Sequence, residues 1–182
     1  LAAHHLFKHL LVPLDGSALA ADILSSASSL ARSCGAGVTL LRVVPPVPLM
    51  TVDVDMSYGP PPFIQDDKAT DLLIEEAKQQ LDEVARRLAD ETGISVDAHV
   101  ILSSRVAQAI IDFASSHTID AITMSTHGRG ASRFLLGSVV DKVLRGSGLP
   151  MLLHRPIGVT GEIDAAEFAR SSATPSLEHA EA

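Results

Sequence analysis

Residues 8–44 read KHLLVPLDGSALAADILSSASSLARSCGAGVTLLRVV, and this stretch predicts a strand, a helix and a second strand. Residues 8–14 and 38–44 are short runs rich in Leu and Val, a composition typical of strands buried on both faces of a parallel sheet. Between them, apolar residues recur at three- and four-residue spacing, which indicates a helix with one buried face. Gly35 follows this helix where a left-handed C-terminal cap is expected.

The same alternation of strands and helices continues beyond this first unit. The periodicity predicts further elements at residues 73–88 (helix, closed by Gly93), 95–102 (strand), 106–114 (helix), 119–124 (strand), 139–144 (helix) and 150–154 (strand). Strands that alternate with helices imply right-handed crossovers and a parallel sheet covered on both faces. The sequence therefore predicts a single doubly wound α/β domain over residues 6–156.

Two segments do not fit this pattern. Residues 45–67 are rich in proline and too long for a simple connection, so they are either a lid or partner-facing loop, or a mobile excursion without a ligand. Residues 157–182 are dominated by small and acidic residues, and we expect them to form a C-terminal tail.

Composition excludes several classes of function. The hydrophobic content of 46% is enough to build a core, and no apolar run reaches the length of a membrane span. A net charge of −8 and an aromatic content of 3% argue against a nucleic-acid-binding protein. The single cysteine, Cys34, rules out a disulfide framework, and the first residues lack a signal-peptide pattern, so we expect a cytoplasmic protein with no nucleic-acid or membrane partner.

The first candidate site is the end of the first strand, residues 13–17, which read PLDGS. Binding sites in doubly wound sheets lie at the carboxyl ends of the strands. Asp15 can accept hydrogen bonds from ribose hydroxyls there, and Gly16 allows the backbone to turn toward the helix. The alternative is structural, because Asp15 or Ser17 could instead cap the first helix.

The second candidate site follows the fourth strand, where residues 124–139 read MSTHGRGASRFLLGSV. Glycines allow backbone N–H groups to approach a phosphate, and the helix that follows adds its positive N-terminal end. The segment is not a Walker A loop, since no Gly-Lys-Ser/Thr follows at the required spacing. It is not a dinucleotide fingerprint either, because Arg133 stands where the third glycine is needed.

Histidines and arginines near these segments have more than one interpretation. His127 could contact phosphate or act as an acid or base, but no paired carboxylate or Ser/His/Asp arrangement indicates a catalytic residue. Arg129 and Arg133 could neutralise phosphate or lie in solvent. Three histidines near the start of the chain lack a matching ligand set, so no metal site is predicted for His4, His5 and His9.

Four segments together resemble the universal stress protein family: residues 12–17, 124–130, 135–139 and 149–153. The resemblance spans about residues 7–156. It implies a five-stranded parallel sheet of order 3-2-1-4-5 and a homodimer formed through the last strand, residues 150–154. One subgroup of the family binds ATP through a motif of the form Gly-x-x-Gly-x9-Gly-Ser/Thr, and another subgroup does not bind ATP.

The resemblance to the ATP-binding subgroup also implies roles for individual residues. Asp15 would hold the ribose or adenine side, while Val43 and Met124 would contact the base. Gly128 and the segment 137–139 would cradle the phosphates. The full set of cofactor-binding residues expected on this basis is Pro13, Leu14, Asp15, Val43, Met124, Ser125, His127, Gly128, Arg129, Gly130, Gly137, Ser138 and Val139.

The glycine motif of this chain is a variant, which leaves two functions open. Ser125 replaces the first glycine, and eight residues separate Gly128 from Gly137 where the pattern has nine. The first function is an adenine-nucleotide-binding regulatory protein of the stress response, which binds ATP, AMP or a cyclic nucleotide, with or without Mg²⁺. With no activated water or magnesium carboxylate visible, it would be at most a slow accessory ATPase. The second is a dimeric interaction module that has lost nucleotide binding.

Overall fold

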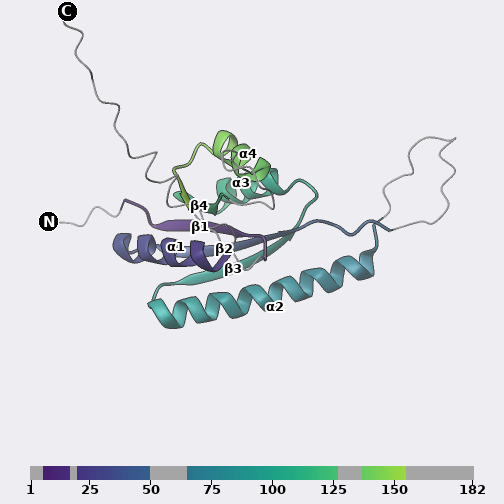
Figure 1. Ribbon diagram of the computed structural model, residues 1–182, viewed down its shortest axis with the longest axis horizontal. Coiled ribbons are helices and arrows are strands. Elements are labelled where there is room, and N and C mark those ends of the chain that lie inside the picture. The colour runs from purple at the N-terminus through teal and green to yellow at the C-terminus, as the bar shows by residue number, and fades with distance from the viewer. Residues whose placement is uncertain (1–5, 17–19, 50–64, 127–136, 155–182) are drawn as a thin grey trace, which may run out of the picture.

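The computed structural model describes residues 6–16, 20–49, 65–126 and 137–154 (Figure 1). Strands and helices alternate along the chain as the periodicity predicts. The elements in chain order are β1 (His9–Leu14), α1 (Ala20–Cys34), β2 (Gly37–Val44), α2 (Asp67–Thr92), β3 (Val96–Leu102), α3 (Val106–Ser116), β4 (Ala121–Ser125), α4 (Ser138–Gly146) and β5 (Met151–His154). No helix in these ranges is long and apolar enough to cross a membrane.

The five strands form one sheet of order β3-β2-β1-β4-β5, in which every neighbouring pair is parallel. This confirms the predicted α/β fold and its 3-2-1-4-5 order. The central strand is β1, where Leu10 pairs with Val38 of β2 on one side and with Ala121 of β4 on the other. Helices α1 and α2 cover one face of the sheet, and α3 and α4 cover the other (Figure 1).

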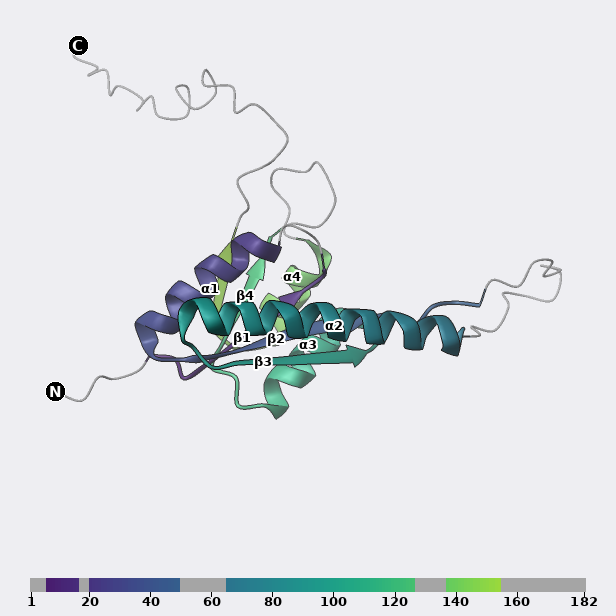
Figure 2. The ribbon, with the colours of Figure 1, turned by 90° about the horizontal axis from the view of Figure 1, so that it is seen from below.

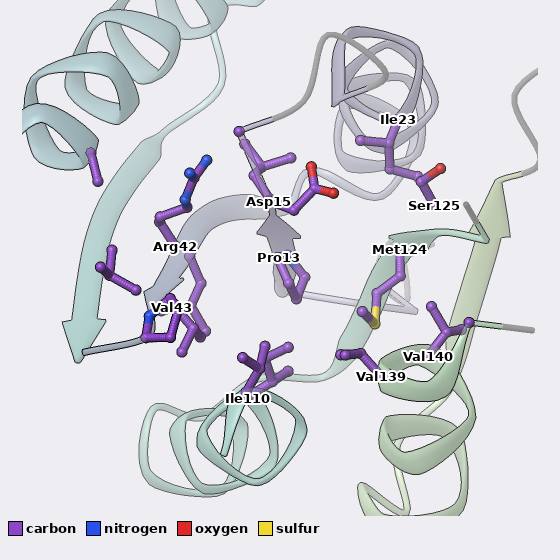
Figure 3. Close-up of a pocket in the computed structure, with 18 of the residues that line it drawn as sticks. Pro13, Asp15, Ile23, Arg42, Val43, Ile110, Met124, Ser125, Val139 and Val140 are labelled. Atoms are coloured by element: carbon purple, nitrogen blue, oxygen red, sulfur yellow. The ribbon is translucent and has the colours of Figure 1, made fainter. Parts of the chain in front are cut away.

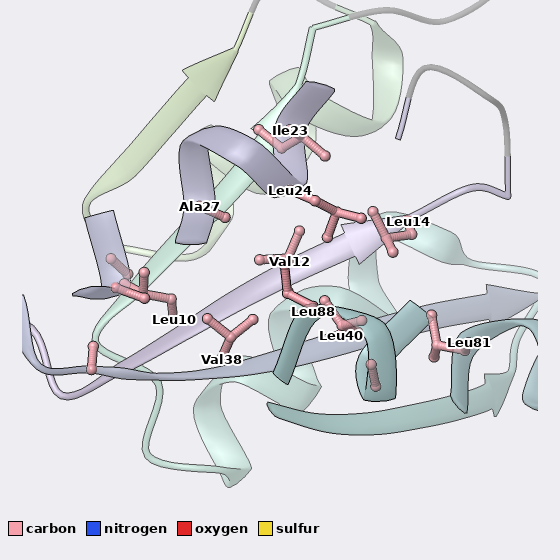
Figure 4. Close-up of a cluster of buried hydrophobic side chains, with 14 residues drawn as sticks. Leu10, Val12, Leu14, Ile23, Leu24, Ala27, Val38, Leu40, Leu81 and Leu88 are labelled. Carbon is pink, nitrogen blue, oxygen red and sulfur yellow. The ribbon is translucent and has the colours of Figure 1, made fainter. Parts of the chain in front are cut away.

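Each face of the sheet has its own hydrophobic core. On the α1–α2 face, Leu10, Val12 and Leu40 pack against α1 and α2 (Figure 4). On the α3–α4 face, Leu11 and Ile122 pack against α3 and α4. Because side chains alternate along a strand, the central strands supply both cores, which explains why their sequences are continuously apolar.

The long helix α2 lies along β3 on the outer part of the sheet (Figure 2). It begins at Asp67, ahead of Leu73, the first residue of the predicted apolar face, and at the last residue of the segment expected to be a loop. The side chain of Asp66 caps it by accepting a hydrogen bond from the backbone N–H of Ala69 at 2.9 Å. The first turns lack a regular apolar stripe, since Leu72 is 65% exposed, so periodicity alone misses them. Gly93 ends the helix with a φ of 71°, as predicted.

The strand β4 begins at Ala121, whereas the sequence predicts a strand from residue 119. Asp120 precedes β4, and its Oδ2 accepts hydrogen bonds from the backbone N–H groups of Lys8 and His9 at 2.7 and 2.8 Å. This carboxylate therefore fixes the start of β1 and ends the preceding loop, which places the first strand residue at Ala121. Residues 50–64 of the expected lid and the tail from residue 155 onward lie outside the described residues.

Candidate functional site

A cavity of about 700 Å³ lies at the carboxyl ends of β1, β2 and β4 and at the start of α4 (Figure 3). It is lined by every predicted site residue that the structure describes, namely Pro13, Leu14, Asp15, Val43, Met124, Ser125, Gly137, Ser138 and Val139. The remaining predicted residues, His127, Gly128, Arg129 and Gly130, lie outside the described residues. Two segments more than a hundred residues apart thus share one concave surface, as expected at the carboxyl edge of a doubly wound sheet.

The residues at the end of β1 line this cavity. The strand ends at Leu14, and Asp15 and Gly16 follow it at the rim. Gly16 has a φ of 76°, a conformation that other residues rarely adopt, which confirms that a glycine makes this turn. Helix α1 is described from Ala20 to Cys34, and residues 17–19 between it and the exposed Asp15 lie outside the described residues. Ser17, the other possible cap, lies outside the described residues.

One side of the cavity is an apolar floor made by Val43, Ile110, Met124, Val139 and Val140 (Figure 3). These side chains belong to the hydrophobic core of the α3–α4 face or pack against it. Met124 is only 6% exposed, and Ile110 is 2% exposed, so the floor is rigidly packed from below. An apolar floor with a few polar groups at the rim of the cavity is typical of a small-molecule site.

The start of α4 supplies hydrogen-bond donors at the rim. Gly137 is the N-cap, and no side chain among the described residues caps the helix. The carbonyl oxygen of Gly137 accepts from the N–H of Asp141 at 2.9 Å, which is the first bond of the helix. The N–H groups of Ser138 and Val139 belong to the first turn and have no acceptor within the helix. Together with the positive end of the helix dipole, they can bind an anion.

Ser125 is the residue that the resemblance predicts to replace the first glycine of the ATP-binding motif. Its side chain lines the cavity near Ile23 of α1 (Figure 3). Its hydroxyl oxygen is buried and has no hydrogen-bond partner among the residues that the structure describes, and the same holds for Thr123. A buried hydroxyl without a partner is destabilising, so Ser125 has an unused hydrogen-bonding group in a residue that lines the cavity.

Several lining residues are not predicted as site residues from the sequence. Ile110 lies in the predicted helix of residues 106–114, and Glu76 and Gln80 lie in that of residues 73–88, with no site role predicted for any of them. Arg42 is not singled out at all, although a charge in an otherwise apolar strand is a usable signal. These residues line the cavity together with Gly16.

Two other features of the sequence are structural in the described chain. His9 lies at the start of β1, and its Nε2 is 2.7 Å from the Thr39 hydroxyl, so the ring joins two strands. Cys34 is half-buried and packs against the core of the α1–α2 face, as its position on the apolar side of the helix predicts. His4 and His5 lie outside the described residues.

Comparison with known proteins gives one consistent result. The model of the universal stress protein family matches residues 6–155. A universal stress protein of Methanocaldococcus jannaschii is 29% identical over 150 residues, which cover 82% of each chain. The universal stress protein of Archaeoglobus fulgidus in complex with dAMP has a TM-score of 0.55 and 21% identity, and covers 81% of this chain and 98% of its own. A universal stress protein in complex with cAMP has a TM-score of 0.57 and 15% identity, and covers 82% and 97%. At these identities the two structures establish the fold.

Proposed function

The chain belongs to the universal stress protein family, and from this premise we propose that it binds an adenine nucleotide in the cavity at the ends of β1, β2 and β4. The observation that carries the proposal is the composition of this cavity. It combines the carboxylate of Asp15, an apolar floor and the uncapped start of α4 on one surface. These three features match the ribose, the base and the phosphates of a nucleotide in turn.

The nucleoside would occupy the part of the cavity nearest β1 and β2. The base would lie on the floor between Val43 and Met124, where burial of its apolar faces stabilises the complex. Asp15 would accept hydrogen bonds from the ribose hydroxyls or from the adenine amino group. Pro13 and Leu14 would form the wall behind the sugar.

The phosphates would extend toward α4. The backbone N–H groups of residues 137–139, the Ser138 hydroxyl and the Ser125 hydroxyl are the described donors at this end. We assign the same role to His127, Gly128, Arg129 and Gly130, which belong to the same loop in the sequence. Mg²⁺ bound to the phosphates would be held by the nucleotide rather than by a carboxylate cluster of the protein.

Complexes of family members with dAMP and cAMP support an adenine nucleotide as the ligand. ATP is our first choice, because Gly137 and Ser138 match the end of the glycine motif through which one subgroup of the family binds ATP. We propose a regulatory role in the stress response within the cytoplasm, with binding rather than hydrolysis as the main activity.

We also propose that two copies form a homodimer through β5. This strand lies at the edge of the sheet, and its side chains include Leu152, which is 38% exposed. An uncovered apolar edge invites pairing, and a two-fold axis would close it symmetrically. Light scattering should give the mass of a dimer at high micromolar concentration. A stable monomer under these conditions would contradict the proposal.

The second candidate function is a dimeric interaction module that no longer binds nucleotides. The observation that favours it is Ser125, whose side chain occupies the cavity wall where the family motif has glycine. A thermal-shift series with ATP, ADP, AMP and cAMP separates the two functions. A nucleotide at 100 times its Kd should stabilise the protein by about 2.7 kcal/mol, whereas an interaction module would show no shift with any of the four.

The two ends of the cavity should respond differently to substitution. Ser138→Ala removes a hydroxyl donor from the phosphate end, so we expect ATP affinity to fall by about 1.5–3 kcal/mol and adenosine affinity to change little. Asp15→Ala removes an acceptor from the nucleoside end, so ATP and adenosine should weaken alike. The measurement is the Kd of each ligand for each variant, with circular dichroism to confirm folding. An equal loss of ATP and adenosine affinity in Ser138→Ala would refute the assignment of Ser138 to the phosphates.

A further inference from the structure

Arg42 is the only charged residue of β2, every residue of which the structure describes. It immediately precedes Val43, so the two side chains point to opposite faces of the sheet. Val43 contributes to the apolar floor, whereas Arg42 lies on the α1–α2 side of the cavity together with Asp15 (Figure 3). Arg42 is half-buried there. Arg42 therefore places a positive charge on the α1–α2 side of the cavity, opposite the apolar floor.

The guanidinium group of Arg42 lies directly against the turn that follows β1. A Cβ atom built on Gly16 would overlap Nη1 of Arg42, so only a glycine leaves room for the guanidinium in this position. This contact places the positive charge beside the backbone of the residue that follows Asp15. The charge therefore lies beside the nucleoside end of the proposed site.

Arg42 makes no hydrogen bond or ion pair with another residue that the structure describes. A half-buried guanidinium with unused donors is costly, and its planar fork matches the geometry of phosphate. Glu76 lines the same side of the cavity, where its Oε1 accepts a hydrogen bond from Nε2 of Gln80 at 3.0 Å, and no ion pair joins its carboxylate to Arg42. The donors of Arg42 consequently remain available for an anionic group of a ligand.

We infer that Arg42 binds a phosphate group carried on the ribose of the nucleotide, at its 2′ or 3′ hydroxyl. The inference rests on the proposed adenine-nucleotide function, which places the ribose at Asp15. In dinucleotide-binding sheets, a carboxylate at this edge holds the ribose hydroxyls, and a nearby arginine accommodates a ribose phosphate. Here Asp15 and Arg42 supply both groups, while the 5′-phosphates extend to α4 on the other side of β1. Arg42 is thus a specificity-determining residue that favours adenine nucleotides phosphorylated on the ribose.

The test compares the Kd values of AMP, adenosine 2′,5′-bisphosphate and adenosine 3′,5′-bisphosphate by titration calorimetry. With the unmodified protein, we expect one bisphosphate to bind about tenfold or more tightly than AMP, and its identity shows which hydroxyl carries the phosphate. Arg42→Gln should weaken this bisphosphate about tenfold more than it weakens AMP. Arg42→Lys keeps the charge but loses the fork, so it should retain part of the preference. Arg32→Gln, an exposed position on α1 outside the cavity, removes the same charge and serves as the matched control.

Each outcome of this experiment decides the inference. Preference for a bisphosphate that disappears in Arg42→Gln and survives in Arg32→Gln supports it. If AMP binds as tightly as both bisphosphates, the role of Arg42 is overturned and the proposed function stands. If the preference for the bisphosphate persists in Arg42→Gln, or falls equally in Arg32→Gln, then Arg42 does not bind the ribose phosphate and the inference is overturned. If none of the three ligands binds, the inference is overturned, and titration with ATP, ADP and cAMP then decides the proposed function separately.

Discussion

Gly137→Val is expected to weaken ATP binding about a hundredfold or more, while the protein remains folded. Gly137 is the N-cap of α4 and lines the cavity at the proposed phosphate position. Its φ of −55° and ψ of 148° are accessible to any residue, so valine adds bulk without backbone strain. The loss of about 2.7 kcal/mol that corresponds to a hundredfold change would come from the branched side chain in the space of the phosphate.

The matched control for this variant is Gly37→Val. Gly37 begins β2 at the opposite end of the strand from Val43, and a Cβ atom there meets only ordinary contacts, with the nearest atom of His9 at 3.5 Å. Valine also suits a strand. We therefore expect Gly37→Val to bind ATP like the unmodified protein. Titration calorimetry on both variants measures the effect, and equal ATP affinities for Gly137→Val and the unmodified protein would show that the phosphates lie elsewhere.

Ile122→Ala is expected to lower the free energy of unfolding by about 2–5 kcal/mol. Ile122 is fully buried in β4 and belongs to the core of the α3–α4 face. It pairs with Leu11 of the central strand and with Met151 of β5. Shortening the side chain removes buried apolar area and leaves a cavity that rigid neighbouring strands cannot fill. A domain of this size is stable by only about 5–15 kcal/mol, so the loss is a large fraction of the total.

Urea denaturation at one fixed protein concentration measures this loss, because association would otherwise change the apparent stability. Leu72→Ala on α2 is the control, since Leu72 is 65% exposed and its loss should cost less than about 1 kcal/mol. Equal effects of Ile122→Ala and Leu72→Ala would mean that the core beneath the cavity floor is not packed as described.

Most of the fold is predictable from the sequence, because its strands are continuous apolar runs and its helices have one apolar face. The segments 8–14 and 38–44 and the cap at Gly35 are examples, and Gly35 has the expected positive φ of 65°. The order of strands in the sheet depends on contacts between distant segments, so periodicity alone does not fix it, and the family resemblance supplied it. The first turn of α2 was not predicted because Leu72 faces solvent and the Asp66 cap is a local signal without an apolar pattern.

The candidate site was only partly predictable. Asp15 and Ser138 were predicted because each stands beside a glycine in a short continuous motif, which the sequence shows without knowledge of the fold. Arg42, Ile110 and Glu76 come from three different elements, and only the folded sheet brings them to one cavity. The conformation of Gly137 was not predictable either, since a glycine in a motif suggests an unusual backbone and the structure shows an ordinary one.

Titration calorimetry of the unmodified protein with ATP, ADP, AMP and cAMP tests the central claim most directly. The cavity joins a carboxylate, an apolar floor and an uncapped helix start, so we expect saturable binding of at least one adenine nucleotide, with a Kd between about 1 μM and 1 mM. The same titration with adenosine should give weaker binding, because it lacks the group that faces α4. Flat titrations with all four nucleotides at millimolar concentration would contradict the account and leave the dimeric interaction module as the function of this fold.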